Sequence, residues 1–460
     1  MEGSDVVHAS ALGQHIVIVN SVKAAIELFE KRSDKYSDRP FLAMDGVAFS
    51  RRIHAAWGQM AEVSQNVPAA FPPRYVAKLP SHSNEKHSPI TSGPAVQSSR
   101  ISGAPQNASK ILFFCHKLTK YSVRLAGAVI MATLYGYEVQ SNDDHFIAIS
   151  EKAMQKLSDS VFPGAAAVNT FPILRYLPSW MPGAGFQQFA AESRKLTKEM
   201  REVPFEFVKQ NMRDGMDSKS IVAKLLEANS PNDEAAIQEV AAAAYGAGAD
   251  TSGSALASFF LAMAVHPDIQ KKAQTEIDTV IGTHRLPGFE DRPSLPYIEA
   301  LYREVMRWKP VGSLGVAHAT TEDDIYDGYF IPKGTTVISN IWAMTRDESI
   351  YSEPERFDPD RFFTADGKLN NDDTILAFGF GRRICVGRHL ADATIWGTIV
   401  SVLSTFNIAK AKDDAGNEID IDPRYSDGMI SHPEPFACSI TPRSEVAKSL
   451  VQDTTETYDL

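Results

Sequence analysis

The 460-residue chain has few cysteines, no apolar run of membrane length and no excess of basic charge. Its three cysteines, Cys115, Cys385 and Cys438, give no disulfide framework and favour a reducing or cytosol-facing environment. The longest apolar stretches, residues 125–135 and 255–265, are shorter than the roughly 18 residues that span a bilayer, so we expect core helices there. The net charge of −11, without a basic stripe, argues against a nucleic-acid partner.

Composition and pattern indicate one large, mostly α domain over residues 1–460, with a small β region. The chain is 43% hydrophobic and 22% charged, which suits a globular protein with a large core. No linker interrupts the chain after residue 139, and helical pattern dominates from residue 111 onward. Near the N-terminus, residues 15–20 predict a first strand, and Ser21 is expected to cap a short helix.

One stretch departs from this organisation. Residues 45–110 are rich in Ser, Pro, Ala and His and show no sustained period of 2 or 3.6. A patternless segment of this length inside a compact domain is itself anomalous. We interpret it as aberrant, through a frameshift, a retained intron or a faulty gene model. Residues 445–460 are expected to be a flexible tail.

The most informative residue is Cys385, in the sequence Phe-Gly-Phe-Gly-Arg-Arg-Ile-Cys-Val-Gly at residues 378–387. This loop leads into an apolar, helix-like stretch at residues 388–404. Neighbouring arginines and a helix N-terminus both lower the pKa of a thiol, and the glycines let the backbone pass close to something flat and bulky. A haem iron is the expected binding partner of such a thiolate. The alternative is a small buried hydrophobe at a strand-to-helix corner.

Five positions of this loop, Phe378, Gly381, Arg383, Cys385 and Gly387, match F-x-x-G-x-R-x-C-x-G, and the chain thereby resembles the cytochrome P-450 family. The resemblance implies a haem b (iron protoporphyrin IX) cofactor, with Cys385 as the metal ligand on its proximal side. It further implies that Arg383 pairs with a haem propionate and that Phe378 shields the sulfur. Gly381 and Gly387 complete the cofactor-binding loop.

A second motif lies on a helix predicted over residues 230–266, which carries the sequence Ala-Gly-Ala-Asp-Thr of the family's A-G-x-D-T motif. The resemblance implies that this helix crosses the distal haem face and that Ala247 and Gly248 border the cofactor. Asp250 and Thr251 would then deliver protons to dioxygen. The alternative is that Thr251 only bonds the carbonyl four residues back in its own helix and bends the axis.

Glu304 and Arg307 stand three apart on a helix predicted over residues 295–308 and match the family's E-x-x-R motif, while Arg356 lies in a P-E-R-F motif. The resemblance implies that the three form a buried ion-pair network that supports folding and haem retention. The alternative is an exposed ion pair. His318 follows this helix where many family members place a propionate partner, although a lone histidine is more often a satisfied polar residue.

The family's W-x-x-x-R motif, whose arginine binds a propionate, is missing. Trp57 is followed by Ala61 instead of arginine, and Trp342 with Arg346 lies in the wrong region. Because the gap falls inside residues 45–110, we expect a cytochrome P-450 fold that is incomplete at its N-terminal side and holds haem weakly. The rival to an active enzyme is therefore a non-catalytic or poorly haem-binding member of the family.

The resemblance implies an oxidoreductase, a haem-dependent monooxygenase that inserts one oxygen atom of dioxygen into a lipophilic small molecule. Apolar loops at residues 310–316 and 427–436 suit such a substrate. Electrons would come from NADPH through a separate NADPH-cytochrome P-450 reductase, because no nucleotide-binding fingerprint is evident.

Residues 327–335 and 426–428 are similar to fungal secondary-metabolism members such as O-methylsterigmatocystin oxidoreductases. Members of this kind face the cytosol on the endoplasmic reticulum membrane. This chain shows neither a signal peptide nor an anchor, so we expect it to be soluble.

Overall fold

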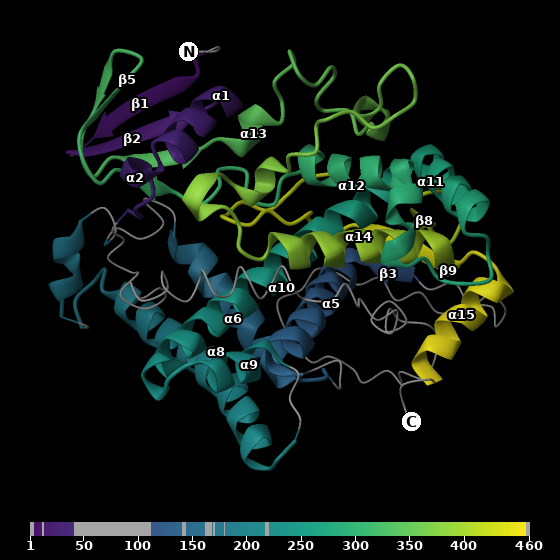
Figure 1. Cartoon of the computed structure of the whole chain (residues 1–460), viewed down its shortest axis with the longest axis horizontal. Coiled ribbons are helices and arrows are strands. Elements are labelled where there is room, and N and C mark those ends of the chain that lie inside the picture. Colours follow the sequence, from purple (N-terminus) through teal and green to yellow (C-terminus); the bar gives the residue numbers. More distant parts are fainter. Residues whose placement is uncertain are drawn as a thin grey trace.

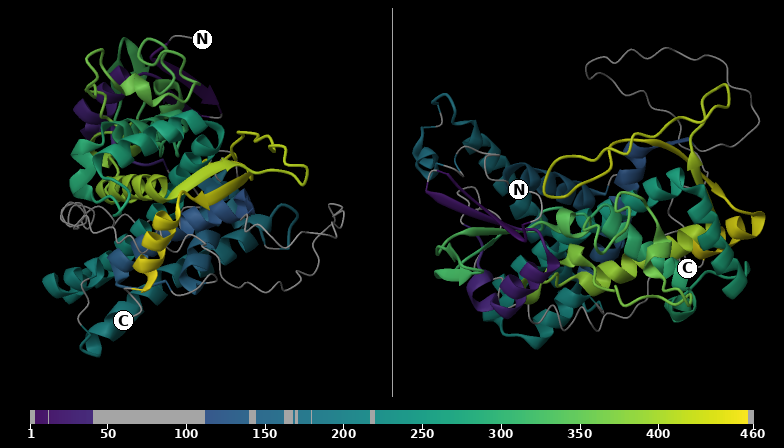
Figure 2. Two further views of the ribbon diagram at one scale, coloured as in Figure 1. Left: turned by 90° about the vertical axis from the view of Figure 1, so that its right-hand side faces the viewer. Right: turned by 90° about the horizontal axis from the view of Figure 1, so that it is seen from above.

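The computed structural model describes residues 4–456 except 12, 41–111, 140–143, 162–167, 169–170, 179 and 217–219. The patternless segment, with Trp57 and Ala61, therefore lies outside the described residues. Helices make up most of the described chain, and small sheets lie at opposite ends of the molecule (Figures 1 and 2). The prediction of a mostly α fold with a small β region is confirmed.

The long helices surround α10, which runs through the middle of the molecule (Figure 1). α10 begins at Glu234, after a 3-10 turn at Pro231–Asp233, and ends at Val265, where Pro267 opens the next helix. Proline fits the first turn of a helix, whose N–H groups have no partner inside it, so both boundaries follow from the sequence. The helices around α10 are α5 (Cys115–Tyr135), α6 (His145–Val161), α8 (Gly185–Arg213), α9 (Ile221–Ala228), α11 (Pro267–Val280), α12 (Pro296–Trp308) and α14 (Arg388–Thr405).

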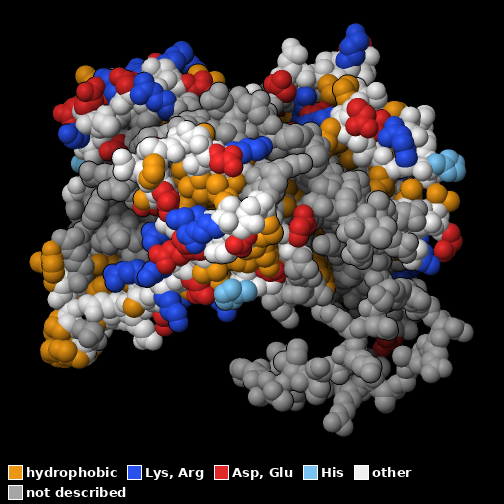
Figure 3. All heavy atoms as spheres, turned by 60° about the horizontal axis from the view of Figure 1, so that its bottom comes forward, with side chains coloured by type: hydrophobic (Ala, Val, Ile, Leu, Met, Phe, Trp, Pro, Cys, Tyr) orange, Lys and Arg blue, Asp and Glu red, His pale blue; other side chains and the backbone are white. Residues whose placement is uncertain are grey.

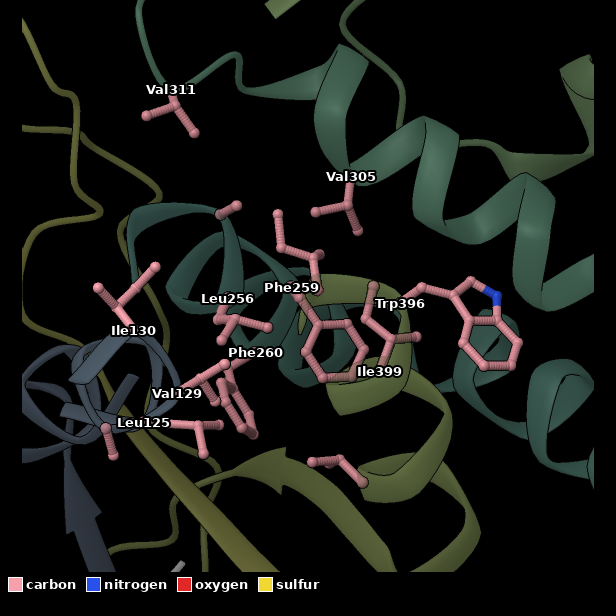
Figure 4. Packing of buried hydrophobic residues seen from close by; sticks show 14 of the residues in the cluster. Leu125, Val129, Ile130, Leu256, Phe259, Phe260, Val305, Val311, Trp396 and Ile399 are labelled. Carbon is pink, nitrogen blue, oxygen red and sulfur yellow. The ribbon is translucent and has the colours of Figure 1, made fainter. Parts of the chain in front are cut away.

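The main hydrophobic core lies where α5, α12 and α14 pack against α10. Figure 4 shows Phe260 of α10 beside Leu125 of α5, and Phe259 of α10 beside Ile399 of α14. Both phenylalanines are at most 1% exposed, and burying such a ring stabilises the fold by roughly 1.5–3 kcal/mol. α10 is therefore held from several sides at once.

Two glycines of α10 have no side chain because neighbouring helices come too close. At Gly253 a Cβ would lie 2.6 Å from the Cα of Val123 in α5, and at Gly246 it would lie 2.8 Å from the sulfur of Met154 in α6. Any larger residue at Gly253 would push the α5 backbone away. Helix packing thus accounts for glycines that are unfavourable in a helix by propensity alone.

A four-stranded sheet forms the N-terminal end of the molecule, in the strand order β1, β2, β7, β4 (Figure 1). β1 is antiparallel to β2, β2 is parallel to β7, and β7 is antiparallel to β4. Val17 pairs with Val337, and both are buried, so apolar side chains fix this register. The strands are β1 (Val6–Ala11), β2 (Gln14–Val19), β4 (His318–Ala319) and β7 (Thr336–Ser339), with a separate hairpin of β5 (Asp324–Tyr326) and β6 (Tyr329–Ile331).

Short helices connect this sheet to the segment that contains Cys385. They are α1 (Val22–Ala25), the π-helix η1 (Ile26–Lys31) and α2 (Ser33–Tyr36). Ser21 caps α1, because its hydroxyl accepts from the N–H of Ala24 at 3.2 Å, as the sequence predicts. Phe29 of η1 is buried in one hydrophobic cluster with Leu376 and Phe380. The N-terminal region therefore supports the cysteine loop directly.

The opposite end of the molecule holds a three-stranded sheet in the order β3 (Leu112–Phe114), β9 (Ala437–Pro442), β8 (Phe406–Lys410), followed by α15 (Glu445–Glu456). Ala447 and Val451 of α15 are buried. The expected flexible tail at residues 445–460 is therefore wrong over this helix, because its apolar side chains at i and i+4 pack against the domain.

Within the described ranges, no helix has the combination of length and apolar character needed to cross a bilayer. On the face shown in Figure 3, basic and acidic side chains are interspersed among apolar ones and do not separate by sign.

Candidate active site

The loop carrying Cys385 is closed by a backbone hydrogen bond. The N–H of Cys385 donates to the carbonyl of Phe378, at the end of η7 (Leu376–Phe378), over 2.8 Å. Gly387 is the N-cap of α14, and the guanidinium of Arg388 donates to the Cys385 carbonyl at 3.2 Å. The half-buried thiol is thereby presented just before the N-terminus of α14.

Burial raises the pKa of the Cys385 thiol above its ordinary value, and the Gly387 N–H and the charge of Arg388 oppose this only in part. The expected net lowering by adjacent arginines is therefore wrong for the protein chain alone. Arg382 is exposed to solvent, and Arg383 donates from Nε to a backbone carbonyl. A bound metal ion itself displaces the thiol proton, so a raised pKa is compatible with ligation.

The glycines of the loop have structural reasons of their own. Gly381 has φ of +57°, and a Cβ there would overlap the carbonyl oxygen of Phe29 in η1. At Gly387 a Cβ would lie 4.0 Å from the sulfur of Cys385, which is an ordinary contact. The structure thus assigns Gly381 to the approach of the N-terminal helix, where the sequence had suggested only the approach of a cofactor.

Two arginines and a histidine gather between the N-terminal segment and this loop; we call Arg39 and Arg383 the cationic cluster, and His318 lies beside them. Arg39 donates to the carbonyl of Ala317 at 2.8 Å, and Arg383 donates to a backbone carbonyl at the same distance. The Nδ1 atom of His318 lies 2.6 Å from the carbonyl oxygen of Tyr36. All three side chains are thus oriented by backbone groups.

Burial, together with the positive charge of Arg383, lowers the pKa of Arg39 to about 10. Burial lowers the pKa of His318 to about 3, and the charges of both arginines contribute. Positive charges held together away from water are stabilised by an anion, and guanidinium groups match the geometry of a carboxylate. His318 and Arg383 lie close enough for the charge of the arginine to act on the imidazole. Arg39 was not anticipated, because nothing in the sequence Asp-Arg-Pro marks it.

On α10, the turn containing the A-G-x-D-T motif is less covered than the turns that follow it, where residues 252–264 are all buried. Ala247 is exposed, and Asp250 and Thr251 are half-buried. The hydroxyl of Thr251 donates to the Ala247 carbonyl at 2.6 Å, which is the intrahelical bond considered as the alternative. At Gly248 a Cβ would lie 2.7 Å from Cδ1 of Ile130 in α5, so packing accounts for this glycine without a cofactor.

Asp250 has a partner that motif analysis missed. The Nε2 atom of His432 lies 3.1 Å from Oδ1 of Asp250, and both side chains are mostly buried. His432 belongs to the loop at residues 427–436, which the sequence suggested only as part of an apolar substrate pocket. No signal in a single sequence links positions so far apart.

The buried ion-pair network forms around Glu304, with one change of membership. Glu304 is fully buried and accepts two hydrogen bonds from Arg307, at 2.7 and 2.8 Å. The second arginine that pairs with Glu304 is Arg361, at 3.3 Å, and the N–H of Asp358 donates to the Glu304 carboxylate at 2.7 Å. Arg356 is largely exposed and pairs with a neighbouring surface carboxylate, so its assignment to the network is wrong.

The error has a simple origin in the sequence. Two segments of the form P-x-R-F follow each other, at residues 354–357 and 359–362, and the sequence prediction takes the network arginine from the first of them. In the structure the second segment forms a 3-10 turn, η6 (Pro359–Phe362), which contacts α12. Only that contact brings Arg361, and not Arg356, to Glu304.

These residues fit a haem. A thiol is a suitable ligand for iron, the cationic cluster suits the two propionate carboxylates, and the exposed turn at Ala247 leaves one stretch of α10 uncovered. The fold and the site together define the class of haem-thiolate proteins.

Comparison with known proteins agrees with this assignment. The family model described as cytochrome P450 matches residues 117–439. The chain belongs to the cytochrome P450 family.

Several curated fungal proteins are similar over most of their length. Cytochrome P450 monooxygenase 208 of Postia placenta is 40% identical, with 99% of this chain and 87% of that protein covered. Cytochrome P450 monooxygenase claR of Ampulloclitocybe clavipes is 38% identical, with coverage of 96% and 81%. Cytochrome P450 monooxygenase ppsD of Aspergillus oryzae is 37% identical, with coverage of 96% and 82%.

Proposed function

We propose that this protein is a monooxygenase that inserts one oxygen atom of dioxygen into a lipophilic small molecule. The observation that carries the proposal is the presence of a half-buried cysteine before α14 together with an acid and an alcohol on the exposed turn of α10. A haem b held by a cysteine supplies the activation of dioxygen. Relatives named as monooxygenases, 36–40% identical to this chain, support the same function.

The chain's own residues would bind and orient this group. Cys385 is the proposed metal ligand, and Phe378, whose carbonyl accepts from the Cys385 N–H, lies beside it in the loop. The cationic cluster is proposed to hold the propionates, with Arg39 supplying the second arginine that the absent W-x-x-x-R motif would otherwise provide. Ala247 is the proposed distal neighbour of the cofactor, because it is exposed in the middle of α10, between the buried residues Gly246 and Ala249.

Proton delivery is proposed for Asp250 and Thr251. The Thr251 hydroxyl donates its proton to the Ala247 carbonyl, so its oxygen lone pairs remain available to accept a hydrogen bond from water or substrate. The side chain of Asp250 is mostly buried but 23% exposed, so its carboxylate keeps contact with solvent. Asp250 and Thr251 are consecutive residues of α10, so both can take part in one relay of protons into a largely apolar site.

Further properties of the protein are proposed from its family. The electron donor is an NADPH-cytochrome P-450 reductase, and the site of action is the cytosolic face of the endoplasmic reticulum membrane. A lipophilic substrate is supported by apolar residues in the loops at 310–316 and 427–436, among them Val311, which is buried, and Val316, which is exposed.

The proposal is tested by expressing the protein with haem precursor and recording the spectrum of the reduced carbon-monoxide complex. A thiolate-ligated haem gives a red-shifted Soret band, and reductase with NADPH should then support oxygen insertion into lipophilic probes. Absence of haem from a folded, soluble preparation would contradict the proposal and favour the poorly haem-binding alternative.

A further inference from the structure

The loop containing His432 is attached to α10 along one face of the helix. Asp250, Ser254 and Ser258 occupy positions i, i+4 and i+8, and all three bond to this loop. The Ser254 hydroxyl donates to the carbonyl of Ser431, and the Ser258 hydroxyl accepts from Tyr425 at 3.0 Å. The loop therefore lies along α10 over more than two turns and is not free to move relative to Asp250.

The backbone at His432 is fixed as well. Its N–H donates to the hydroxyl of Ser426 at 3.0 Å, and its carbonyl accepts from the N–H of Ser426 at 2.8 Å. The neighbouring Ser431 N–H donates to the carbonyl of Val311 at 2.9 Å, which ties the loop to the segment after α12. The imidazole is therefore placed by several short hydrogen bonds that do not involve Asp250.

The imidazole is held in one orientation. Its Nε2 atom faces Oδ1 of Asp250 at 3.1 Å, and its Nδ1 atom is buried without a hydrogen-bond partner among the residues that the structure describes. An ionised carboxylate only accepts hydrogen bonds, so Nε2 carries the hydrogen in this contact. A buried polar atom left unpaired is unfavourable, and the bond to Asp250 offsets that cost.

We propose that His432 is the positioning residue for Asp250, whose Nε2–H holds the carboxylate in place beside Thr251. This inference rests on the proposed proton delivery by Asp250 and Thr251 and adds a residue from outside the family motif. Without His432, the Asp250 carboxylate is free to rotate toward solvent or another donor. The group that starts the proton relay to Thr251 then has no fixed position. The effect of His432 on the reaction therefore passes through Asp250.

The first test measures the pair without turnover. Urea unfolding is followed for the wild type, Asp250→Asn, His432→Leu and the double variant, all in the haem-loaded protein. If the contact exists, the product of the two single-variant effects on the unfolding equilibrium constant should differ from the effect of the double variant by a factor of about 3 to 10, as expected for residues in direct contact. An additive cycle would overturn the proposal.

The second test measures how tightly NADPH use is coupled to product, with reductase and 7-ethoxycoumarin as the lipophilic probe. His432→Leu should raise the hydrogen peroxide formed per NADPH severalfold, whereas His432→Gln, whose amide keeps a donor near the Nε2 position, should retain most of the coupling. Ser254→Ala is the matched control, because it removes one anchor of the same loop and leaves the contacts of His432 with Asp250 and Ser426 in place. It should raise peroxide release much less than His432→Leu does.

The outcomes separate this inference from the proposed function. Equal peroxide release by His432→Leu, His432→Gln and Ser254→Ala would show that His432 is only a structural anchor of the loop. If Thr251→Ala diverts NADPH to peroxide while His432→Leu does not, proton delivery by the motif stands and the role of His432 falls. If the wild type oxidises no probe, the unfolding cycle still decides whether His432 and Asp250 interact.

Discussion

The cysteine loop and the exposed turn of α10 are built in different ways. Around Cys385, the closing hydrogen bond comes from within the loop itself, at residues 378–387, and Phe29 supports it from behind. On α10, Asp250 is held by His432, which arrives from a loop near the other end of the chain. The first arrangement is nearly complete in a local motif, whereas the second depends on a tertiary contact. We therefore expect changes in the loop to remove the cofactor, and changes at the turn to alter only how the cofactor is used.

The largest effect should come from Cys385→Ala, which removes the only proposed metal ligand. The red-shifted Soret band of the reduced carbon-monoxide complex should disappear, because neither Cys115 nor Cys438 lies in a loop of this sequence. Cys438→Ala is the matched control, since Cys438 is buried in β9 and away from the loop. A retained band in Cys385→Ala would contradict the ligand assignment.

The next effect concerns the network behind the loop, since α12 contacts both η7 and α14. Glu304→Ala leaves Arg307, only 4% exposed at its side chain, without its carboxylate. The free energy of unfolding should fall by about 3–5 kcal/mol. Arg356→Ala, on an exposed side chain, should change it by less than about 0.5 kcal/mol. Urea denaturation of both variants measures the difference, and equal losses would restore Arg356 to the network.

Arg39 provides a test of whether the N-terminal segment contributes to haem binding together with the cysteine loop. Arg39→Ala should weaken haem binding by about 1.5–3 kcal/mol, roughly 10- to 100-fold in the dissociation constant, because a charge-assisted hydrogen bond to a propionate is lost. Haem transfer to apomyoglobin measures this loss. Arg382→Ala is the control, because Arg382 is a solvent-exposed arginine of the loop. Equal haem loss from the two variants would exclude a specific role for Arg39.

His318 should make stability depend on pH. Its pKa is about 3 in the folded protein and 6.5 in the reference state, so the unfolded chain binds the proton first as pH falls. The contribution of His318 to stability is therefore fully present above about pH 6.5 and is lost progressively toward pH 3. Between pH 7.5 and 5 this residue alone should cost about 2 kcal/mol. His318→Gln should lack this component in urea titrations, and parallel pH profiles for the two proteins would contradict the prediction.

The smallest effect on stability should come from Thr251→Ala. Among the residues that the structure describes, its hydroxyl bonds only the carbonyl of Ala247 in the same helix, so the free energy of unfolding should change by less than about 0.5 kcal/mol. Haem content should be normal, while more of the NADPH consumed should appear as hydrogen peroxide. If coupling is unchanged, Thr251 has only a structural role in the helix, and the exposed turn of α10 does not control how the cofactor is used.

Local features of the fold were predictable because short-range rules produce them. The cap at Ser21 and the start of α10 after Pro231 both follow from capping and proline chemistry. Prediction failed where two local patterns were equivalent. The choice between Arg356 and Arg361 could not be made locally, and α15 was missed because the burial of Val451 depends on the rest of the domain.

The sequence by itself determined the cysteine, its loop and the acid–alcohol pair, because each is a contiguous motif whose chemistry lies within a few residues. Only the tertiary structure decided which partners these groups have: Arg361 for Glu304, Arg39 beside Arg383, and His432 for Asp250. Such partners are selected by helix packing and by loops that return from distant positions, and neither leaves a periodic or spacing signal in a single sequence. Burial likewise set the direction of the Cys385 pKa, because desolvation depends on everything packed around a group and not on its neighbours in the chain.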